Sequence, residues 1–197
     1  MKIDLHTHTL ERSPCSRVAE GDLIRAAIAR GLDALVITDH NRLVPREHVA
    51  ALNARFAPFR VFSGIEISLR SEHVLVIGVH DTLLETRTWS YAALHAFVRE
   101  RGGFLALAHP FRYHPISVRL RRFPPDAVEL YSHNTPRGME QRIRRIAARI
   151  DMAVLSNSDA HDADWLGDYY NVLPDAPADE AELVAMLRSG DFTTAPV

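Results

Sequence analysis

Two short motifs, one near each end of the chain, carry paired side chains that could bind a metal ion. His6 and His8 are separated by one residue, and so are Asp159 and His161. Residues i and i+2 of an extended segment point to the same side, so each pair can reach one ion. Neutral histidine nitrogens and carboxylate oxygens bind Zn²⁺, Mn²⁺ or Fe²⁺. The spacing therefore predicts a divalent metal centre.

More histidines and carboxylates follow other apolar runs of the sequence, close to where each run ends. They are Asp39, His40, Glu66, His80, His109, Glu129 and His133. A tetrahedral site uses four ligands, whereas about eight of these residues and the paired ones are candidate ligands, which indicates two or three ions. Ions about 3.5–4 Å apart clamp the attacking and leaving oxygens of a phosphate ester. This pattern favours hydrolysis of phosphate esters.

Seven apolar runs must position these side chains. They are Lys2–Leu5, Ala34–Thr38, Arg60–Ser68, His73–Val79, Phe104–Ala108, Ala127–Tyr131 and Ala153–Asn157. Nearly continuous apolar runs are typical of strands buried on both faces. Between them lie segments with helical periodicity: Gly21–Arg30, Pro45–Phe56, Tyr91–Arg101, Pro136–Ile150 and Asp179–Ser189. This alternation predicts an α/β fold, preferably a closed or nearly closed β/α barrel whose C-terminal strand ends gather the polar residues, with a doubly wound open sheet as the alternative.

Length and composition predict one soluble domain, residues 1–197. The 23 basic and 25 acidic side chains give a net charge of −2, so nonspecific binding of nucleic acid is not expected. Cys15 is the only cysteine, which excludes an internal disulfide and fits a reducing compartment. The N-terminus lacks the apolar run of a signal peptide, and no apolar stretch approaches the roughly 20 residues that span a bilayer. We therefore expect a cytoplasmic protein that does not associate with membranes.

Five motifs, taken in order, resemble those of a known family. They are Asp4–Thr9, Ile37–His40, Gly64–Ser68, Ala108–Pro110 and Ser158–His161, and they span most of the chain, from residue 4 to about residue 167. Their types and order are similar to the successive motifs of the polymerase-and-histidinol-phosphatase (PHP) family. The resemblance implies a distorted seven-stranded (β/α)7 barrel that holds two or three ions of zinc, manganese or iron. It also implies a metal-dependent phosphoesterase activity.

The resemblance also implies a distribution of ligands. One metal would be held by His6, His8, Glu66 and Asp159, and a second by His40 and His161. Glu66 would bridge to a third, completed by His109 and one further histidine. Both His80 and His73 fit a version of that last motif. We favour His80, because it follows the end of its strand as the other ligands do.

One position departs from the family pattern. After His8 the family often has an Asp or His that completes the second metal site. Here the sequence runs from Glu11 to Ser16 as Glu-Arg-Ser-Pro-Cys-Ser, in which Ser13 is a poor ligand. Glu11 or Cys15 could substitute, or the second site could lack a ligand.

Two residues are predicted to act on the substrate. Arg112 closely follows His109, and a guanidinium group binds phosphate through two parallel hydrogen bonds, so we expect Arg112 to hold the phosphate. His133 lies in a segment that resembles the substrate-side segment of the family, and would donate a proton to the leaving group or orient the substrate. The expected reaction is hydrolysis of a small phosphomonoester by a hydroxide that several metal ions activate.

Three other functions remain open from the sequence. The first is a nuclease acting on the 3′ ends of short oligonucleotides, for which Arg119, Arg121 and Arg122 could supply a local basic patch. The second is a catalytically silent PHP domain that keeps metals for stability or partner binding, which the missing ligand after His8 would explain. The third, a hydrolase of C–N bonds, usually needs a bridging lysine, and the only lysine is Lys2.

Overall fold

One sheet organises the molecule. The computed structural model describes residues 1–70, 72–116 and 118–195, and the strands within these ranges form a nine-stranded sheet in the order β7-β6-β5-β4-β3-β2-β1-β8-β9. Their bounds are β1 Lys2–Thr7, β2 Ala34–Ile37, β3 Arg60–Ser68, β4 His73–Ile77, β5 Phe104–Leu107, β6 Ala127–Tyr131, β7 Ala153–Ser156, β8 Tyr170–Val172 and β9 Thr193–Ala195. The seven predicted runs correspond to β1–β7, and the sequence reading missed only β8 and β9 among the described strands.

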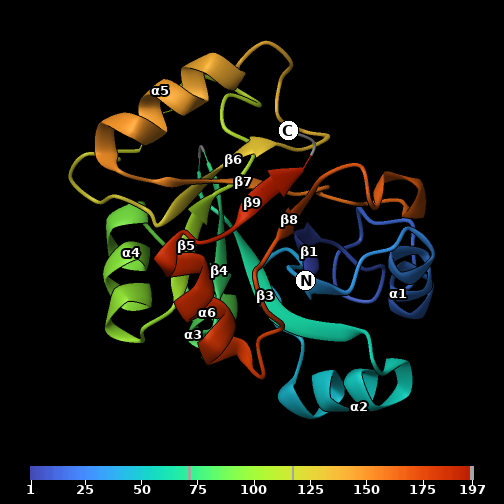
Figure 1. Cartoon of the computed structure of the whole chain (residues 1–197). Helices are drawn as coiled ribbons and strands as arrows, with labels where there is room; N and C mark the ends of the chain where they lie inside the picture. The colour runs from blue at the N-terminus through green and yellow to red at the C-terminus, as the bar shows by residue number, and fades with distance from the viewer. Residues whose placement is uncertain (71, 117, 196–197) are drawn as a thin grey trace.

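The helices surround this sheet. Their bounds are α1 Glu20–Ala29, α2 Arg46–Phe56, α3 Leu83–Thr86, α4 Tyr91–Glu100, α5 Glu140–Ile150 and α6 Glu180–Ser189, with a short 3₁₀ turn at Ala163–Trp165. Figure 1 shows α1, α2, α4 and α5 around the outside of the sheet and α6 in front of the strands. Local sequence sets the ends of α6: the Asp179 side chain accepts a hydrogen bond from the Glu182 N–H, and Gly190 follows with a φ of 72°. No helix in the described part of the chain is long and apolar enough to cross a membrane.

Strand direction decides which residues meet. β1, β2 and β3 run parallel, and so do β5, β6 and β7, but β4 is antiparallel to both of its neighbours. Only residues 69–72 connect β3 to β4, and a parallel connection needs a dozen residues or more. We call the end of the barrel where β1–β3 and β5–β7 finish its C-terminal end. Because β4 is reversed, it starts at this end and finishes at the opposite, N-terminal end.

Side chains close the gap between the two ends of the sheet. Asn171 on β8 accepts a hydrogen bond from the Ser156 N–H at 3.0 Å and donates to the Ser156 carbonyl at 2.8 Å. The side chain of Asn157 accepts from the Leu5 N–H on β1 at 3.3 Å. These bonds replace a regular strand ladder. The result is a nearly closed, barrel-like sheet of nine strands, and it does not confirm the (β/α)7 detail that the family resemblance implied.

Apolar side chains fill the barrel. Ile3, Leu5 and Phe104 are completely buried inside it, together with other residues from β2, β4 and β7. Leu183 and Leu187 of α6 join the same core and close the N-terminal end. Burying each such side chain contributes about 1.5–3 kcal/mol, so the interior is a packed core. The polar strand residues are consequently gathered at the C-terminal end.

Candidate metal centre

Four side chains converge within the C-terminal end of the barrel. His6 on β1, His8 just after it, Glu66 on β3 and Asp159 after β7 are at most 1% exposed. The Nε2 atoms of the two histidines lie 3.0 Å apart, and each is 3.2–3.3 Å from Glu66 Oε2 and from Asp159 Oδ1. Ligand atoms around a tetrahedral ion with bonds of about 2.0–2.1 Å lie roughly 3.3 Å apart. The spacing of this group is therefore that of the ligands of one small divalent cation.

The group also leaves buried atoms without partners. Within the described ranges, Glu66 Oε2, Asp159 Oδ1 and His40 Nδ1 are buried side-chain atoms that make no hydrogen bond of acceptable geometry. A buried polar atom left unsatisfied costs about 1–3 kcal/mol, and more when it is charged. Nitrogen and carboxylate oxygen donors are a set that Zn²⁺, Mn²⁺ and Fe²⁺ accept. The residues present thus fit a cation.

Glu66 connects this group to further histidines. Its Oε1 lies 2.8 Å from His73 Nδ1 and 3.0 Å from His109 Nε2, while its Oε2 lies 2.9 Å from His40 Nδ1. His40, Glu66 and His73 offer ligand atoms within 4.8 Å of one another, and so do His8, His40 and His161. We call the whole set the histidine–carboxylate cluster; it consists of His6, His8, His40, Glu66, His73, His109, Asp159 and His161.

Neighbouring side chains hold the imidazole rings in place. His6 Nδ1 lies 2.8 Å from Glu129 Oε1, and the other oxygen of Glu129 accepts from the His109 N–H at 2.6 Å. His8 Nδ1 lies 3.3 Å from Ser13 Oγ. A ring that donates from Nδ1 presents the lone pair of Nε2 to the cluster. Many histidines that bind a metal through one ring nitrogen have a carboxylate at the other, as His6 has Glu129 at its Nδ1.

Unusual backbone conformations place two members of the cluster. His109 has a φ of 24° and Asp159 a φ of 54°, both in the left-handed region. Such a conformation costs of order 1–3 kcal/mol and persists where surrounding structure enforces it. Each residue follows the end of a strand, and the turn directs its side chain to the cluster. The backbone strain therefore lies at two residues of the candidate metal centre.

Charge sets the protonation of the cluster. Burial lowers the pKa of His8, but the nearby carboxylates of Asp159 and Glu66, each 3.2 Å from its Nε2, outweigh burial and raise the pKa to about 9. Burial raises the pKa of Glu66, yet His6, His109 and His40 together hold it well below its usual range. Burial, followed by the charge of His8, lowers the pKa of His161 to about 4. A cation entering the cluster therefore meets ionised carboxylates and a neutral His161, and displaces protons from other histidines.

Solved structures of other proteins share this fold. A protein from Bifidobacterium adolescentis, proposed to be a metal-dependent phosphoesterase, has a TM-score of 0.71 at 15% identity, over 94% of this chain and 95% of its own. A two-domain protein from Bacteroides vulgatus containing a predicted PHP-like metal-dependent phosphoesterase has a TM-score of 0.72 at 14% identity, over 98% and 64%. The lesion-specific endonuclease PfuEndoQ from Pyrococcus furiosus has a TM-score of 0.68 at 17% identity, over 98% and 57%. At these identities the similarity shows the fold, and the chain spans less than two thirds of the last two proteins.

Sequence comparison adds a family match in the last part of the chain. Residues 140–192, from the start of α5 to just beyond α6, match the family described as PHP-associated. The chain is therefore similar to a PHP-like protein in fold over nearly its whole length, and to the PHP-associated family in sequence over this last part. No curated protein sequence matches it. The resemblance of the five motifs to PHP proteins is thus supported by both fold and sequence.

The barrel does not bring His80 to the cluster. His80 lies at the N-terminal end, where its Nε2 pairs with Glu180. His73 lies in the cluster instead, because the antiparallel β4 begins at the C-terminal end and His73 is its first residue. The preference for His80 rested on all strands running the same way. The four-residue connection between β3 and β4 was the signal that could have corrected it.

The segment after His8 places no further carboxylate beside the cluster. Glu11 is exposed, and both its oxygens accept from the Glu20 N–H at the start of α1. Cys15 is exposed at the edge of the cluster, and burial of its surroundings raises the pKa of its thiol. Ser13 is buried and binds the His8 ring and the His40 N–H instead. The sequence left three alternatives for the second metal site: Glu11 as a ligand, Cys15 as a ligand, or no added ligand. These contacts agree best with no added ligand.

The two residues expected to act on substrate lie at the rim of the histidine–carboxylate cluster. Arg112 Nη1 lies 3.8 Å from Asp159 Oδ2, beside the cluster. His133 has no contact with the cluster that the described residues show; its Nε2 lies 3.1 Å from Asp168 Oδ2, and its ring stacks on Trp165. Sequence reasoning missed Asn134, whose side-chain amide donates to Asp159 Oδ2 at 2.7 Å. In the sequence, the only indication that Asn134 belongs to the site was its position directly after His133.

A cavity of about 360 Å³ opens beside the cluster. It is lined by Cys15, Arg17, Arg112, Asn134, His161, Asp162 and Trp165. Two guanidinium groups and an indole ring are thus presented next to a candidate ligand. The cavity thus places positive charge next to one end of the histidine–carboxylate cluster.

Proposed function

We propose that this protein is a PHP metal-dependent phosphoesterase that hydrolyses a small phosphomonoester. The observation that carries the proposal is the pair of buried carboxylate oxygens, Glu66 Oε2 and Asp159 Oδ1, which have no hydrogen-bond partner and lie among histidine nitrogens. Metal-binding phosphoesterases need such a donor set. The neighbouring proteins proposed to be phosphoesterases add support.

Residues of the cluster would hold two or three divalent ions. His6, His8, Glu66 and Asp159 would form one ligand group, and Glu66 would be shared with a second group formed by His40, His73 and His109. His161 would contribute to a third together with His8 and His40. Bound cations would supply a nucleophile at neutral pH and neutralise charge on the phosphate. Glu129 would hold His6 in the orientation that this binding requires.

Arg112 would hold the phosphate group. Its side chain is 28% exposed and stands between the cavity and the cluster. A guanidinium group offers two parallel donors to phosphate oxygens and stays charged at any relevant pH. Arg17 lines the same cavity and would add a second positive charge. Arg112 and Arg17 would stabilise the negative charge that develops on these oxygens during the reaction. This is the largest contribution that the chain's own side chains can make to the rate.

His133 would act on the leaving group. Asp168 and Trp165 fix its ring at the rim of the site, so a proton on its Nε2 would be held in one direction. It would either donate that proton to the leaving alkoxide or orient the substrate. The cavity of about 360 Å³ beside the cluster is at the small end of ligand sites, which favours a small substrate.

Activity and metal content measured on the same sample test the proposal. We expect the protein loaded with Mn²⁺ or Zn²⁺ to hydrolyse p-nitrophenyl phosphate or a member of a panel of sugar, nucleotide and amino-alcohol phosphates. His6→Ala should lose both metal and activity. The matched control is His95→Ala, a helix residue outside the cluster whose ring contacts the Pro124 carbonyl. Full metal occupancy without turnover would instead indicate a catalytically silent PHP domain.

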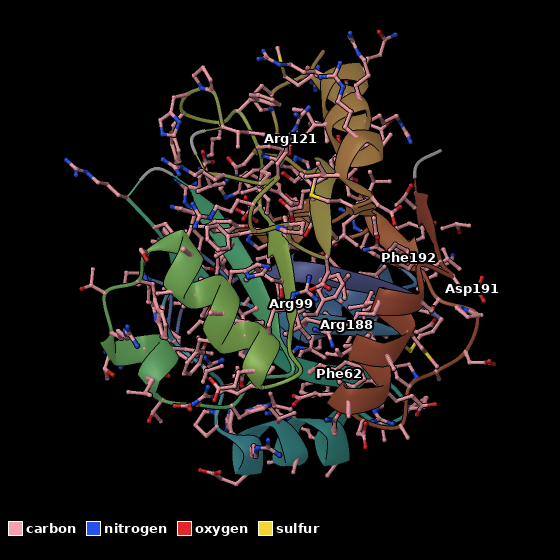
Figure 2. All side chains as sticks on the ribbon, turned by 90° about the vertical axis from the view of Figure 1, so that its left-hand side faces the viewer. Phe62, Arg99, Arg121, Arg188, Asp191 and Phe192 are labelled. Atoms are coloured by element: carbon pink, nitrogen blue, oxygen red, sulfur yellow. The ribbon has the colours of Figure 1, made fainter. Side chains whose placement is uncertain are left out.

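A nuclease is the second candidate. Arg119, Arg121 and Arg122 lie in one segment and, with Arg149 of α5, line a groove. Figure 2 shows Arg121 well away from Arg99 and Arg188, so these arginines form a surface of their own. A polyanionic strand would need such a surface. Digestion of a labelled single-stranded oligonucleotide by the metal-loaded protein, compared with phosphomonoester hydrolysis, distinguishes the two substrates.

A further inference from the structure

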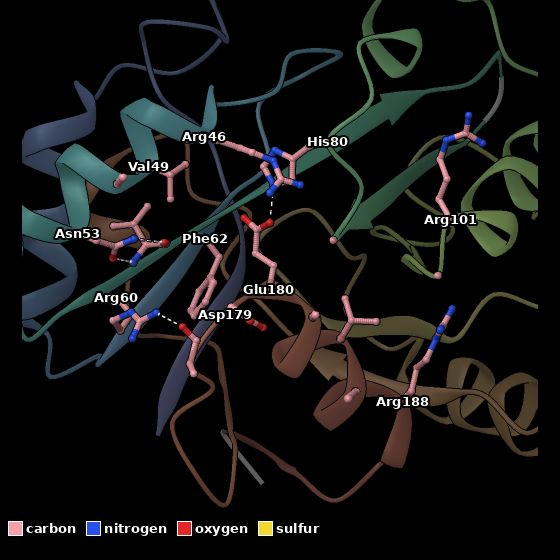
Figure 3. Close-up of a pocket in the computed structure, with 18 residues that line it drawn as sticks. Arg46, Val49, Asn53, Arg60, Phe62, His80, Arg101, Asp179, Glu180 and Arg188 are labelled. Atoms are coloured by element: carbon pink, nitrogen blue, oxygen red, sulfur yellow. Dashed lines mark hydrogen bonds and ion pairs between the residues drawn. The ribbon is translucent and has the colours of Figure 1, made fainter.

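A second and larger cavity lies at the N-terminal end of the barrel. Its volume is about 710 Å³, and α2, the beginning of β3, the residues after β4 and α6 form its walls (Figure 3). His80, seven residues beyond His73, lines this cavity, because β4 runs from one end of the barrel to the other. None of the lining residues belongs to the histidine–carboxylate cluster. The cavity is therefore a feature separate from the candidate metal centre.

Part of the cavity surface is apolar. Val49 of α2, Phe62 of β3 and Val184 of α6 all line it. A Cβ atom at Gly78 would lie only 2.6 Å from Val184 Cγ2, so α6 is seated directly against the end of β4. Gly78 also has a φ of +79°, which other residues rarely adopt. The walls are consequently fixed by close packing of the Val184 side chain on Gly78.

Four guanidinium groups surround this apolar surface. They belong to Arg46, Arg60, Arg101 and Arg188, and Figure 3 shows them spread around the cavity. Three of them already have acceptors: Arg60 donates to the Ala178 carbonyl at 2.6 Å, Arg101 to Asp81 at 3.0 Å, and Arg188 lies 3.4 Å from Asp126. Among the described residues, Arg46 has no hydrogen-bond or ion-pair partner. Of the lining arginines that the structure describes, Arg46 is thus the one whose guanidinium group does not already have an acceptor.

The acidic residues of the lining are already engaged. Glu180 pairs with His80 through one oxygen and accepts from the Ser63 N–H at 3.0 Å through the other. Asp179 caps α6 by accepting from the Glu182 N–H at 2.9 Å. Neither carboxylate contacts Arg46 in the described structure. The cavity therefore offers positive charge beside an apolar wall.

We propose that this cavity binds a small organic anion, with its acidic group at Arg46 and its apolar body against Val49, Phe62 and Val184. An apolar pocket with a few convergent polar groups is the usual form of a small-molecule site, and 710 Å³ lies within the common range of about 300–1,000 Å³. A guanidinium without a competing carboxylate pairs with a carboxylate, sulfonate or phosphate. Such a ligand would bind independently of the reaction proposed at the other end of the barrel.

The test uses 8-anilinonaphthalene-1-sulfonate, an aromatic sulfonate, and its fluorescence on binding the intact chain. Arg46→Glu should weaken binding by at least about tenfold, because it reverses the charge that meets the sulfonate. Arg55→Glu makes the same charge change at another exposed arginine of α2 that does not line the cavity, and should leave the dissociation constant within about twofold. Equal effects of the two variants would overturn the proposal.

A second pair of variants tests where the probe binds, because a large side chain introduced into the cavity would occupy its space. Ala50 and Ala51 are adjacent exposed residues of α2, and only Ala50 lines the cavity. Ala50→Trp should prevent binding by filling the space, whereas Ala51→Trp should not. Binding should persist in His8→Ala, and Arg46→Glu should hydrolyse phosphate esters as the unaltered protein does. Binding that is lost in His8→Ala but kept in Ala50→Trp would place the probe at the metal centre and refute the proposal, whether or not the protein proves to be a phosphoesterase.

Discussion

Replacing His73 and His80 separately tests how β4 positions the candidate metal centre. The two histidines stand at opposite ends of the same stretch of chain, and only His73 contacts Glu66, at 2.8 Å. His73→Ala removes a direct candidate ligand. His80→Ala removes a partner of Glu180 at the far end of the barrel. His73→Ala should therefore change the metal content, whereas His80→Ala should change the thermal stability.

The magnitudes follow from the contacts. Loss of a residue that merely orients a metal ligand lowers affinity about 10–100-fold, so loss of a ligand should cost at least about 100-fold. His80 and Glu180 have side chains 8% and 19% exposed, and a hydrogen bond to a charged group in such a position contributes about 1.5–3 kcal/mol. For a chain of this length each kcal/mol shifts Tm by about 2–4 °C. We expect His80→Ala to lower Tm by roughly 3–12 °C.

Metal analysis, thermal unfolding and phosphatase assays on both variants check this prediction. His73→Ala should contain less metal after dialysis against a weak chelator and should lose at least about 100-fold in kcat/KM. His80→Ala should keep the metal content and the kcat/KM of the unaltered protein. If His80→Ala lost metal while His73→Ala kept it, the reversed direction of β4 could not be the reason for the ligand set.

Four further predictions concern single features of the site and the fold. Glu129→Gln weakens the support of His6 and should lower metal affinity about 10–100-fold, measured by competition with a chelating dye. Arg112→Ala should lower kcat/KM by about 100-fold with unchanged metal content, and equal activity would remove its role in phosphate binding. Because the pKa of His8 is raised from 6.5 to about 9 without metal, its stabilising contribution is present below pH 6.5 and lost as pH rises through 9, so Tm of the chelated protein should fall over that interval. In Gly103→Ala the new Cβ would lie 2.2 Å from a buried valine methyl group, which should destabilise the fold by about 1–3 kcal/mol in urea unfolding.

Sequence patterns predicted the strands better than their directions. Strands buried on both faces, such as β2 with its sequence Ala-Leu-Val-Ile, appear as uninterrupted apolar runs, so β1–β7 were located within a few residues. β8 and β9 have three residues each, too short for any periodicity to be seen. The reversal of β4 is not encoded in its apolar pattern, which is the same in either direction. Only the length of the connection before it carries that information.

In the candidate site, too, residues of a local motif were easier to predict than residues whose position depends on strand direction. The His-x-His motif places both of its members in the cluster, because i and i+2 share a side of an extended chain. Asp159 and His161 also both reach the cluster, but through a turn in which Asp159 has a φ of 54°, not through an extended segment. His73 was ranked below His80 because its place depends on strand direction. Asn134 was missed because an amide after a histidine is common, and only the fold brings it to Asp159. Their roles in binding metal remain predictions until ions are measured.

Asn157 has a consequence for how the protein matures. Its side chain receives hydrogen bonds from Leu5 and Asn171 and donates to Glu129, the carboxylate that holds His6. The ribosome makes the N-terminal histidines first and the asparagines about 150 residues later. Until Glu129 and Asn157 have been synthesised, the His6 ring lacks the side chains that hold it from behind. Under the proposed function, uptake of metal would therefore follow the synthesis of these residues.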